Sequence, residues 1–254
     1  LPKSAAIQSY HVKDVMGCVM MWHDPEGGDP EYDAPCLAEW DDPSWVHWEL
    51  DHLGETAIHG QEILDNMADS QHLGPTHGAP CEYFENEIEG HLCIQRQGGF
   101  HQIYNAMLTT LTWYTGPGVL LSKQEFGDVL TFELIANTPV DDGVSKVWHA
   151  ALAQAQNVPH SAEDIATAKE IQAGALVAFA ADFDVWTHKR SALRIMQMKN
   201  DGPFNMVRKW YGQFFDSQEN SATYLDEAAG IYHVPSLDKP SEKAQELEAG
   251  LFGR

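Results

Sequence analysis

The sequence predicts an α+β fold in which a meander of antiparallel strands is followed by a long helix. Segments of alternating apolar and polar residues, separated by turns rich in Gly and Asp, occupy the middle of the chain. An alanine-rich stretch without proline follows them, from Ala162 to about His188, and predicts the helix. With 254 residues, 43% of them apolar, the chain is long enough to enclose a sizeable core.

The N-terminal part of the chain predicts a small separate segment and a linker. Residues 12–22 are rich in apolar side chains around Gly17, which predicts a hairpin or a buried strand. Proline, glycine and aspartate dominate from residue 23 onward, so we place a linker at 27–44 and a separate segment at 1–26. Partial alternation over 45–52 predicts the first strand of the main domain.

Further strands are predicted from alternation between the turns. These segments are 86–95, 108–114, 119–123, 129–137 and 145–153. The turns Gly116-Pro117-Gly118 and Asp141-Asp142-Gly143 are short enough to join antiparallel neighbours. The segments therefore predict a meander.

Helices are predicted to follow the strands. Ser161 is a good N-cap, and Glu163 and Asp164 stand in the first turn beside the positive end of the helix. After the break at Gly202-Pro203, residues 204–215 predict a shorter, aromatic-rich helix. Residues 217–254 are polar and interrupted by prolines, which predicts a surface tail behind a main domain at 45–216.

Composition excludes several classes of function. The net charge of −23 would repel phosphate backbones, so nucleic acid is an unsuitable partner. No apolar run approaches the roughly 20 residues that a membrane-spanning helix requires. The four cysteines, Cys18, Cys36, Cys81 and Cys93, are not in C-x-x-C spacing, which excludes a zinc ribbon or an iron–sulfur site. Reduced thiols in a cytoplasmic protein are expected.

Residues 64–77 concentrate acids and histidines. They include Asp65, Asp69, His72 and His77. On one helix the first three would share a face, and we expect Gly74-Pro75 to break the helix and bring His77 round to the same point. Imidazoles that converge beside an acid suit a divalent transition metal, although polar histidines at a helix end would show the same spacing.

A third ligand is predicted from the long helix. Asp182 shares an apolar stripe with Ile171, Ala175 and Ala178, and a buried carboxylate requires a cation or an ion pair. Asp184 lies about 200° away around the helix and should face elsewhere. The alternative is an ion pair of Asp182 with Lys189, with Arg190 or with a residue of a neighbouring strand.

His72, His77 and Asp182 together form a set of two histidines and one carboxylate. Such a facial triad is the usual host of non-heme Fe(II), because it leaves coordination positions open for O₂.

The motif Asp65-x3-Asp69-x2-His72-x4-His77 resembles the mononuclear-iron motif of the Rieske non-heme iron oxygenases. The similarity is greatest to the oxygenase component of the 3-ketosteroid 9α-hydroxylases. Further blocks that resemble this group are Trp22–Gly27, Glu89–His91, Asp182–Trp186, Asp201–Pro203 and Arg208–Phe214.

The resemblance implies a helix-grip fold, in which a curved antiparallel sheet wraps around a long C-terminal helix. It implies that His72, His77 and Asp182 bind mononuclear Fe(II). Asp69 would be the bridging acid that connects the iron to a Rieske [2Fe–2S] cluster on a neighbouring subunit of a homotrimer. Electrons from NADH would arrive through a separate ferredoxin or flavin reductase.

The sequence also departs from the family pattern. The Rieske motif, C-x-H followed by C-x-x-H, is absent from this sequence. Residues 1–26 are therefore expected to be the end of a Rieske domain whose cluster-binding residues lie outside this sequence. Small residues flank His77 where the steroid hydroxylases carry aromatic ones, which implies a roomier pocket. Ala181 stands where a Gln is usual.

The functional hypothesis is therefore O₂-dependent hydroxylation of a bulky apolar substrate, with a steroid as the first choice. Alternatives are demethylation, desaturation or aromatic-ring hydroxylation by the same centre, and a non-catalytic helix-grip protein that binds an apolar ligand. The substrate cavity is expected between the sheet and the long helix. Candidate lining residues are Leu111, Trp113, Val119 and Phe132.

Overall fold

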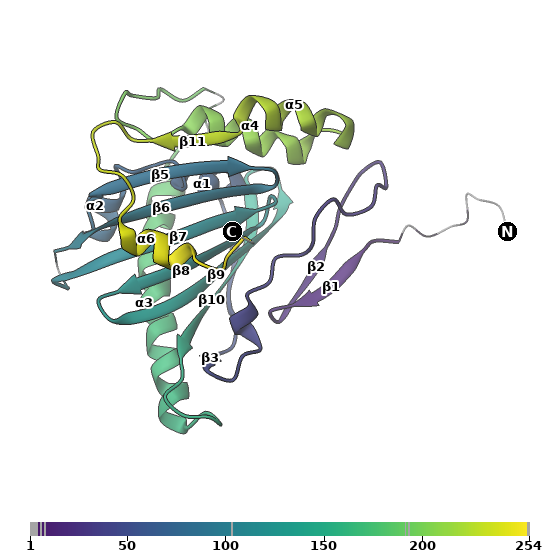
Figure 1. Cartoon of the computed structure of the whole chain (residues 1–254). Helices are drawn as coiled ribbons and strands as arrows, with labels where there is room; N and C mark the ends of the chain where they lie inside the picture. Colours follow the sequence, from purple (N-terminus) through teal and green to yellow (C-terminus); the bar gives the residue numbers. More distant parts are fainter. Residues whose placement is uncertain are drawn as a thin grey trace.

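The computed structural model describes residues 5, 7, 9–102, 104–190, 192 and 194–252. A nine-stranded antiparallel sheet dominates it, in the order β11-β5-β6-β7-β8-β9-β10-β3, with β4 also paired to β10 (Figure 1). The strands are β3 (Trp45–His47), β4 (Asp51–Thr56), β5 (Tyr83–Glu89), β6 (Leu92–His101), β7 (Ala106–Thr115), β8 (Val119–Phe126), β9 (Val129–Asp141), β10 (Val144–Gln154) and β11 (Gly230–His233). Strands β5 to β10 follow one another in space as in sequence, so the predicted meander is confirmed.

The long helix α3 (Ala162–Trp186) runs across one face of this sheet (Figure 1). The Ser161 hydroxyl accepts a hydrogen bond from the Asp164 N–H, and the Asp164 carboxylate accepts one from the Ser161 N–H, at 3.1 and 2.8 Å. This reciprocal capping box confirms the predicted start of the helix. Within the described part of the chain, no helix combines the length and apolar character that crossing a bilayer requires.

Each face of the sheet is covered by a separate apolar core. On the α3 face, Leu64, Tyr114 and Ile135 pack with α1 (Gly60–Asn66), α3 and α4 (Phe204–Gly212). On the opposite face, side chains such as Leu111 and Phe132 pack against the N-terminal segment and α6 (Glu242–Glu248). Because side chains alternate along a strand, each central strand contributes to both cores.

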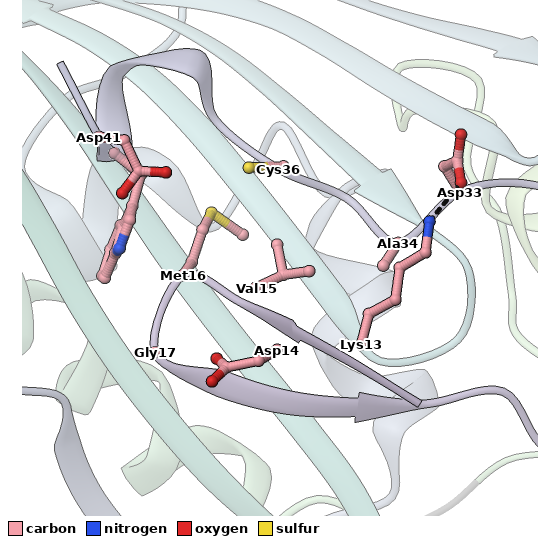
Figure 2. Close-up of a pocket in the computed structure, with 10 residues that line it drawn as sticks. Lys13, Asp14, Val15, Met16, Gly17, Asp33, Ala34, Cys36 and Asp41 are labelled. Atoms are coloured by element: carbon pink, nitrogen blue, oxygen red, sulfur yellow. Dashed lines mark hydrogen bonds and ion pairs between the residues drawn. The ribbon is translucent and has the colours of Figure 1, made fainter. Parts of the chain in front are cut away.

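The N-terminal segment begins with a hairpin of β1 (Val12–Val15) and β2 (Cys18–Met21), which forms its own two-stranded sheet. The predicted hairpin is therefore confirmed. Residues 27–44 that follow contain one short 3₁₀ helix, η2 (Ala38–Trp40). An open pocket of about 520 Å³ lies between the hairpin turn at Met16 and residues 33–41. Figure 2 shows the residues that line it. Met16 itself is buried on the outer face of the large sheet, which fixes the hairpin there.

Two strand predictions are wrong in detail. Residues 86–95 are not one strand, because β5 and β6 meet there in a tight hairpin around Gly90. The apolar alternation of Ile88, Leu92 and Ile94 continues across the turn and conceals it. The segment 45–52 is divided between β3 and the start of β4, both of which pair with β10.

The predicted helix over 204–215 is confirmed as α4 and the 3₁₀ turn η3 (Gln213–Phe215). The predicted surface tail is wrong, because residues 217–254 contribute α5 (Gln218–Ala228), β11 and α6. Arg96 on β6 donates two hydrogen bonds to Glu248, at 2.6 and 2.7 Å, and so attaches α6 to the sheet. These short elements bury few apolar residues, so the segment looks polar in sequence. The domain boundaries at 26, 44 and 216 stay a prediction.

Candidate metal centre and its cavity

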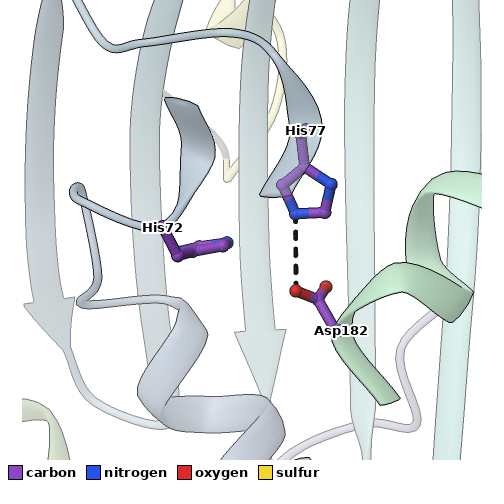
Figure 3. Close-up of side chains that lie close together, drawn as sticks. All are labelled: His72, His77 and Asp182. Carbon is purple, nitrogen blue, oxygen red and sulfur yellow. Dashed lines mark ion pairs between the residues drawn. The ribbon is translucent and has the colours of Figure 1, made fainter. Parts of the chain in front are cut away.

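Three side chains that are far apart in the sequence converge between the sheet and the helices. His72 precedes α2 (Leu73–His77), His77 is its last residue, and Asp182 comes from α3 (Figure 3). One possible ligand atom from each lies within 4.8 Å of the others, and His77 Nε2 is 3.5 Å from Asp182 Oδ1. The structure thus brings together the three metal ligands that the sequence predicted.

The chain reaches this geometry differently from the prediction. We expected one helix through residues 65–72, broken at Gly74-Pro75, but α1 ends at Asn66 and a turn separates it from α2. Gly74-Pro75 lies in the first turn of α2, where a missing N–H costs no helical hydrogen bond. Gly78, with φ of 72°, ends α2 in the left-handed conformation. The turn, rather than the proline break, orients both histidines.

Asp69 shapes that turn. Its Oδ1 accepts hydrogen bonds from the N–H groups of Gln71 and His72, at 2.9 and 3.2 Å. Its backbone carbonyl lies 2.6 Å from His72 Nδ1 and accepts the ring N–H. This bond leaves His72 Nε2 as the nitrogen with a free lone pair, which is the arrangement that metal-binding histidines require.

The electrostatics of the site suit a cation. Burial lowers the pKa of His72, although the charges of Asp69 and Asp182 act in the opposite direction, so the ring is neutral at pH 7. Asp182 is only 7% exposed, and a buried carboxylate is costly without a cation. Metal bonds of about 2.1 Å place adjacent donor atoms about 3 Å apart, which is close to the 3.5 Å between His77 Nε2 and Asp182 Oδ1.

The buried face of α3 differs slightly from the predicted stripe. Asp182 does lie on the packed face, and Asp184 is exposed, as predicted. Phe179 and Trp186 are its buried neighbours, whereas Ala178 of the predicted stripe is exposed, as is Val185. Trp186 Nε1 donates a hydrogen bond of 3.2 Å to Asn66 Oδ1, which ties the end of α3 to the end of α1.

Asp65 does not face the histidines, contrary to the prediction. Its carboxylate accepts two hydrogen bonds from Arg208 on α4, at 2.8 and 2.5 Å, and lies 3.4 Å from Lys189 Nζ. Lys189 also pairs with Glu62 at 2.5 Å. This buried ion network connects α1, α4 and the chain just after α3. Sequence reasoning missed it because spacing alone does not reveal a partner so far along the chain.

Two glycines allow neighbouring backbone segments to lie unusually close to the residues just after α1 and α2. A Cβ on Gly202 would lie 2.1 Å from the Ala68 carbonyl oxygen, directly after α1. A Cβ on Gly99 of β6 would lie 2.1 Å from the carbonyl oxygen of Pro80, just after α2. Both distances are far below van der Waals contact, so only glycine permits these close approaches. In the sequence, Gly202 indicated only the end of a segment.

A cavity of about 110 Å³ adjoins two of the three side chains. His72 and Asp182 form part of its wall. Its apolar lining includes Ile63, Met67, Leu120, Ile135, Phe179 and Trp186, and its polar lining includes Asn66, Gln95 and Thr112. A mostly apolar cavity with a few polar groups is typical of a site that binds and orients a small molecule.

The predicted pocket residues Leu111, Trp113, Val119 and Phe132 do not line this cavity. All of them pack in the core on the opposite face of the sheet. Leu111 and Trp113 flank Thr112, whose side chain points to the cavity face because side chains alternate. Alternation reveals two faces but not which one meets the helix, and here both faces are covered. The lining residues Thr112 and Leu120 are next to the predicted ones on β7 and β8, whereas on β9 the lining residue is Ile135, three positions from Phe132.

Comparison with known proteins gives a consistent picture. The family model described as the 3-ketosteroid 9alpha-hydroxylase C-terminal domain matches residues 21–215. A probable 3-ketosteroid-9-alpha-monooxygenase oxygenase component from Rhodococcus rhodochrous is 26% identical over 240 residues, covering 87% of this chain and 60% of the relative. The cholesterol 7-desaturase of Bombyx mori is 25% identical over 260 residues, covering 89% of this chain and 52% of that protein. The chain thus spans about 60% of the length of the curated monooxygenase relatives.

Solved structures support the fold. Dicamba monooxygenase bound to dicamba is similar with a TM-score of 0.56 at 14% identity, covering 87% of this chain and 73% of that one. The NdmA protein of Pseudomonas putida with caffeine is similar with a TM-score of 0.61 at 12% identity, covering 90% and 68%. At these identities the similarity shows a shared fold, with the large antiparallel sheet and its crossing helix.

Proposed function

This chain belongs to the family of 3-ketosteroid 9α-hydroxylase C-terminal domains, and on this premise we propose that it is the catalytic domain of a Rieske-type non-heme iron oxygenase. The observation that carries the proposal is the convergence of His72, His77 and Asp182 beside a mostly apolar cavity. A protein that merely binds an apolar ligand has no need of a buried carboxylate beside two imidazoles. The non-catalytic alternative is therefore the weaker one.

The proposed metal is a mononuclear Fe(II), held by His72, His77 and Asp182. The donor set fits, because two histidines and one carboxylate leave coordination positions open. When bound, the iron would supply the activation of O₂. The chain's own contribution is to hold the His72 ring through the Asp69 carbonyl, to keep the Asp182 carboxylate buried, and to exclude bulk water with the apolar wall.

The proposed reaction is hydroxylation of a bulky apolar substrate, with a steroid as the first candidate. The names of the relatives support this class, and the apolar lining of the cavity agrees with it. Pockets for drug-sized ligands are about 300–1,000 Å³. The cavity of about 110 Å³ would therefore receive the reacting end of the substrate, and the remainder would extend beyond it.

A desaturation or demethylation by the same centre is the second candidate. The named desaturase relative is nearly as similar to this chain as the monooxygenases are, at 25% against 26% identity. Desaturation needs the same iron and O₂, so product analysis rather than metal analysis separates the two reactions.

Electrons are proposed to come from a Rieske [2Fe–2S] cluster that these residues do not bind, reduced by a separate ferredoxin or flavin reductase. Asp69 is the proposed bridging residue towards a cluster on a neighbouring subunit of a trimer. Its side chain is 34% exposed while its backbone holds His72, so it connects the surface to a metal ligand. A cytoplasmic location stays part of the same proposal.

The test is turnover of the full-length oxygenase with reductase, NADH and ¹⁸O₂, using a 3-ketosteroid as substrate. The expected product carries one ¹⁸O atom, and product formation requires Fe(II). An unsaturated product without ¹⁸O would favour the desaturase candidate. Absence of both products, together with absence of bound iron after anaerobic loading, would contradict the proposed function.

A further inference from the structure

Polar side chains form a continuous hydrogen-bonded ladder on the sheet face that α3 covers. Thr112 Oγ1 lies 2.9 Å from Ser122 Oγ, and Gln124 Nε2 lies 3.3 Å from the same Ser122 oxygen and 2.7 Å from Glu133 Oε2. Glu133 Oε1 is 2.9 Å from His149 Nε2. We call these residues, Thr112, Ser122, Gln124, Glu133 and His149, the polar ladder. It crosses from β7 to β10, and Thr112 at its end lines the cavity.

The far end of the polar ladder is a protonated histidine. His149 is 0% exposed, and its two ring nitrogens lie 2.9 Å from Glu133 Oε1 and from Asp51 Oδ2. A carboxylate only accepts, so both ring nitrogens must donate. Burial lowers the pKa of His149, but the hydrogen bonds and charges of Glu133 and Asp51 outweigh burial and raise it. Both carboxylate oxygens of Glu133 therefore act as acceptors, Oε1 from His149 and Oε2 from Gln124.

The acceptor role of Glu133 fixes the direction of every hydrogen bond in the polar ladder. Because Glu133 Oε2 only accepts, Gln124 must present its NH₂ group, and that group also reaches the Ser122 oxygen. Among the described residues, the Ser122 hydroxyl hydrogen has one acceptor within reach, Thr112 Oγ1. Ser122 is buried, and a buried donor without an acceptor is costly. Ser122 therefore donates to Thr112.

The Thr112 hydroxyl hydrogen then has no acceptor in the polar ladder, and Thr112 is one of the residues that line the cavity. Within the described part of the chain, the Thr112 hydroxyl has no hydrogen-bond partner besides Ser122. The other polar groups of the wall are oriented by different bonds. Asn66 Oδ1 accepts from Trp186, and Gln95 Nε2 donates to the Met67 carbonyl at 3.2 Å.

We propose that Thr112 donates a hydrogen bond to a neutral carbonyl oxygen of the substrate, and so determines which carbon the substrate presents to the metal centre. A single hydroxyl without a positive charge suits a neutral carbonyl, since a buried carboxylate requires a counter-charge. Thr112 shares the cavity wall with His72 and Asp182, so a substrate held there has its carbonyl beside the reacting region. This inference rests on the proposed function for its substrate class, but its geometry stands on the polar ladder alone.

The experiment compares matched ligand pairs by anaerobic calorimetry on the Fe(II)-loaded protein. One pair is a 3-ketosteroid and its 3-deoxy analogue, and the other is acetophenone and ethylbenzene. A neutral hydrogen bond corresponds to about a five- to tenfold difference in Kd. Wild type and Thr112→Ser should prefer at least one ketone by this factor, and Thr112→Val should lose that preference.

The matched control is Thr110→Val. Thr110 is a buried threonine on the same strand, but its hydroxyl donates to the Gln97 carbonyl and does not line the cavity. This variant should keep the ketone preference. Glu133→Gln should weaken it with Thr112 intact, because an amide at this position no longer forces the direction of the polar ladder.

The outcomes separate this inference from the proposed function. No ketone preference in either pair, including no binding at all, would overturn it, as would a preference that survives Thr112→Val. A preference unchanged in Glu133→Gln would overturn the role of the polar ladder. If only the acetophenone pair shows a preference that depends on Thr112, the inference stands and the steroid assignment fails.

Discussion

Arg208 holds Asp65 with two hydrogen bonds, at 2.8 and 2.5 Å, across 143 residues of sequence. Both residues occur in the blocks that resemble the oxygenase family. The acid lies on α1, which leads into the turn bearing His72, and Arg208 on α4 also donates to the Ala192 carbonyl at 2.6 Å. The pair thus joins α1 to α4, and the bond to Ala192 connects both helices to the chain that follows α3.

Asp65→Asn should therefore destabilise the protein and weaken metal binding. Removing one partner of a buried ion pair leaves an uncompensated charge and costs about 3–5 kcal/mol. Arg208→Lys should also destabilise, because an ammonium group cannot form both bonds. Denaturant unfolding measures both effects. The control Lys13→Ala, which removes the exposed pair of Lys13 with Asp33, should leave the unfolding midpoint unchanged. Equal effects of all three variants would contradict a special role for the buried pair.

His72→Ala, His77→Ala and Asp182→Ala should each lose bound iron. Anaerobically loaded wild type should hold about one Fe(II) per chain, as a facial triad predicts. The matched control is Asp184→Ala, which changes an exposed acid on the same helix and should keep the iron. Metal analysis after desalting gives the measurement. Iron retained at wild-type stoichiometry in any of the first three variants would remove that residue from the site.

Asp69→Asn should keep the fold and the iron but lose most turnover in the full-length oxygenase. The amide oxygen of Asn can still accept from the N–H groups of Gln71 and His72, so the turn persists and only the charge is removed. Asp69→Ala should in addition reduce iron content, because it removes the cap of the turn. Single-turnover and steady-state rates measure the effect. Near wild-type turnover in Asp69→Asn would show that the residue does not carry the electron path.

Gly202→Ala should destabilise the protein by about 1–3 kcal/mol, as overpacking does. The new Cβ would lie 2.1 Å from the Ala68 carbonyl oxygen, so the loop after α1 must shift. Gly174→Ala on α3 is the matched control, because a Cβ there would meet no heavy atom within 4 Å beyond its own turn of helix. In a helix interior, this replacement should stabilise by about 0.5–1 kcal/mol. Thermal and denaturant unfolding should thus show effects of opposite sign.

Stability should fall as the pH rises through the folded-state pKa of His149. The unfolded value is about 6.5, and the partners Glu133 and Asp51 raise the pKa in the folded protein. The stabilisation by the charged ring is thus fully present below the unfolded value and is lost above the folded one. His149→Gln should be less stable than wild type at pH 6, and the difference should shrink at alkaline pH. A difference that is constant between pH 6 and pH 9 would show that the ring does not titrate.

The order of the strands and the long capped helix follow from the sequence, because alternation, turn residues and the Ser161 cap act locally. The convergence of His72, His77 and Asp182 was also accessible, since only a few residue types bind metals. The ion pair of Asp65 with Arg208 could not be predicted, because nothing near Asp65 in the sequence specifies Arg208 as its partner. The prediction of the residues that line the cavity was wrong for a different reason. Leu111 and Thr112 are adjacent and both buried, so burial alone does not indicate which side chain faces the helix.

The short strand β11 has a consequence for the edge of the large sheet. It pairs with β5 from Gly230 to His233, and His233 Nδ1 lies 2.9 Å from Glu85 Oε2. Without β11, the outer N–H and C=O groups of β5 would be unpaired, and an open edge of this kind recruits strands from other molecules. The C-terminal segment thus covers this edge and opposes edge-to-edge aggregation. A protein shortened to the end of α4 would be prone to self-association even with its metal ligands intact.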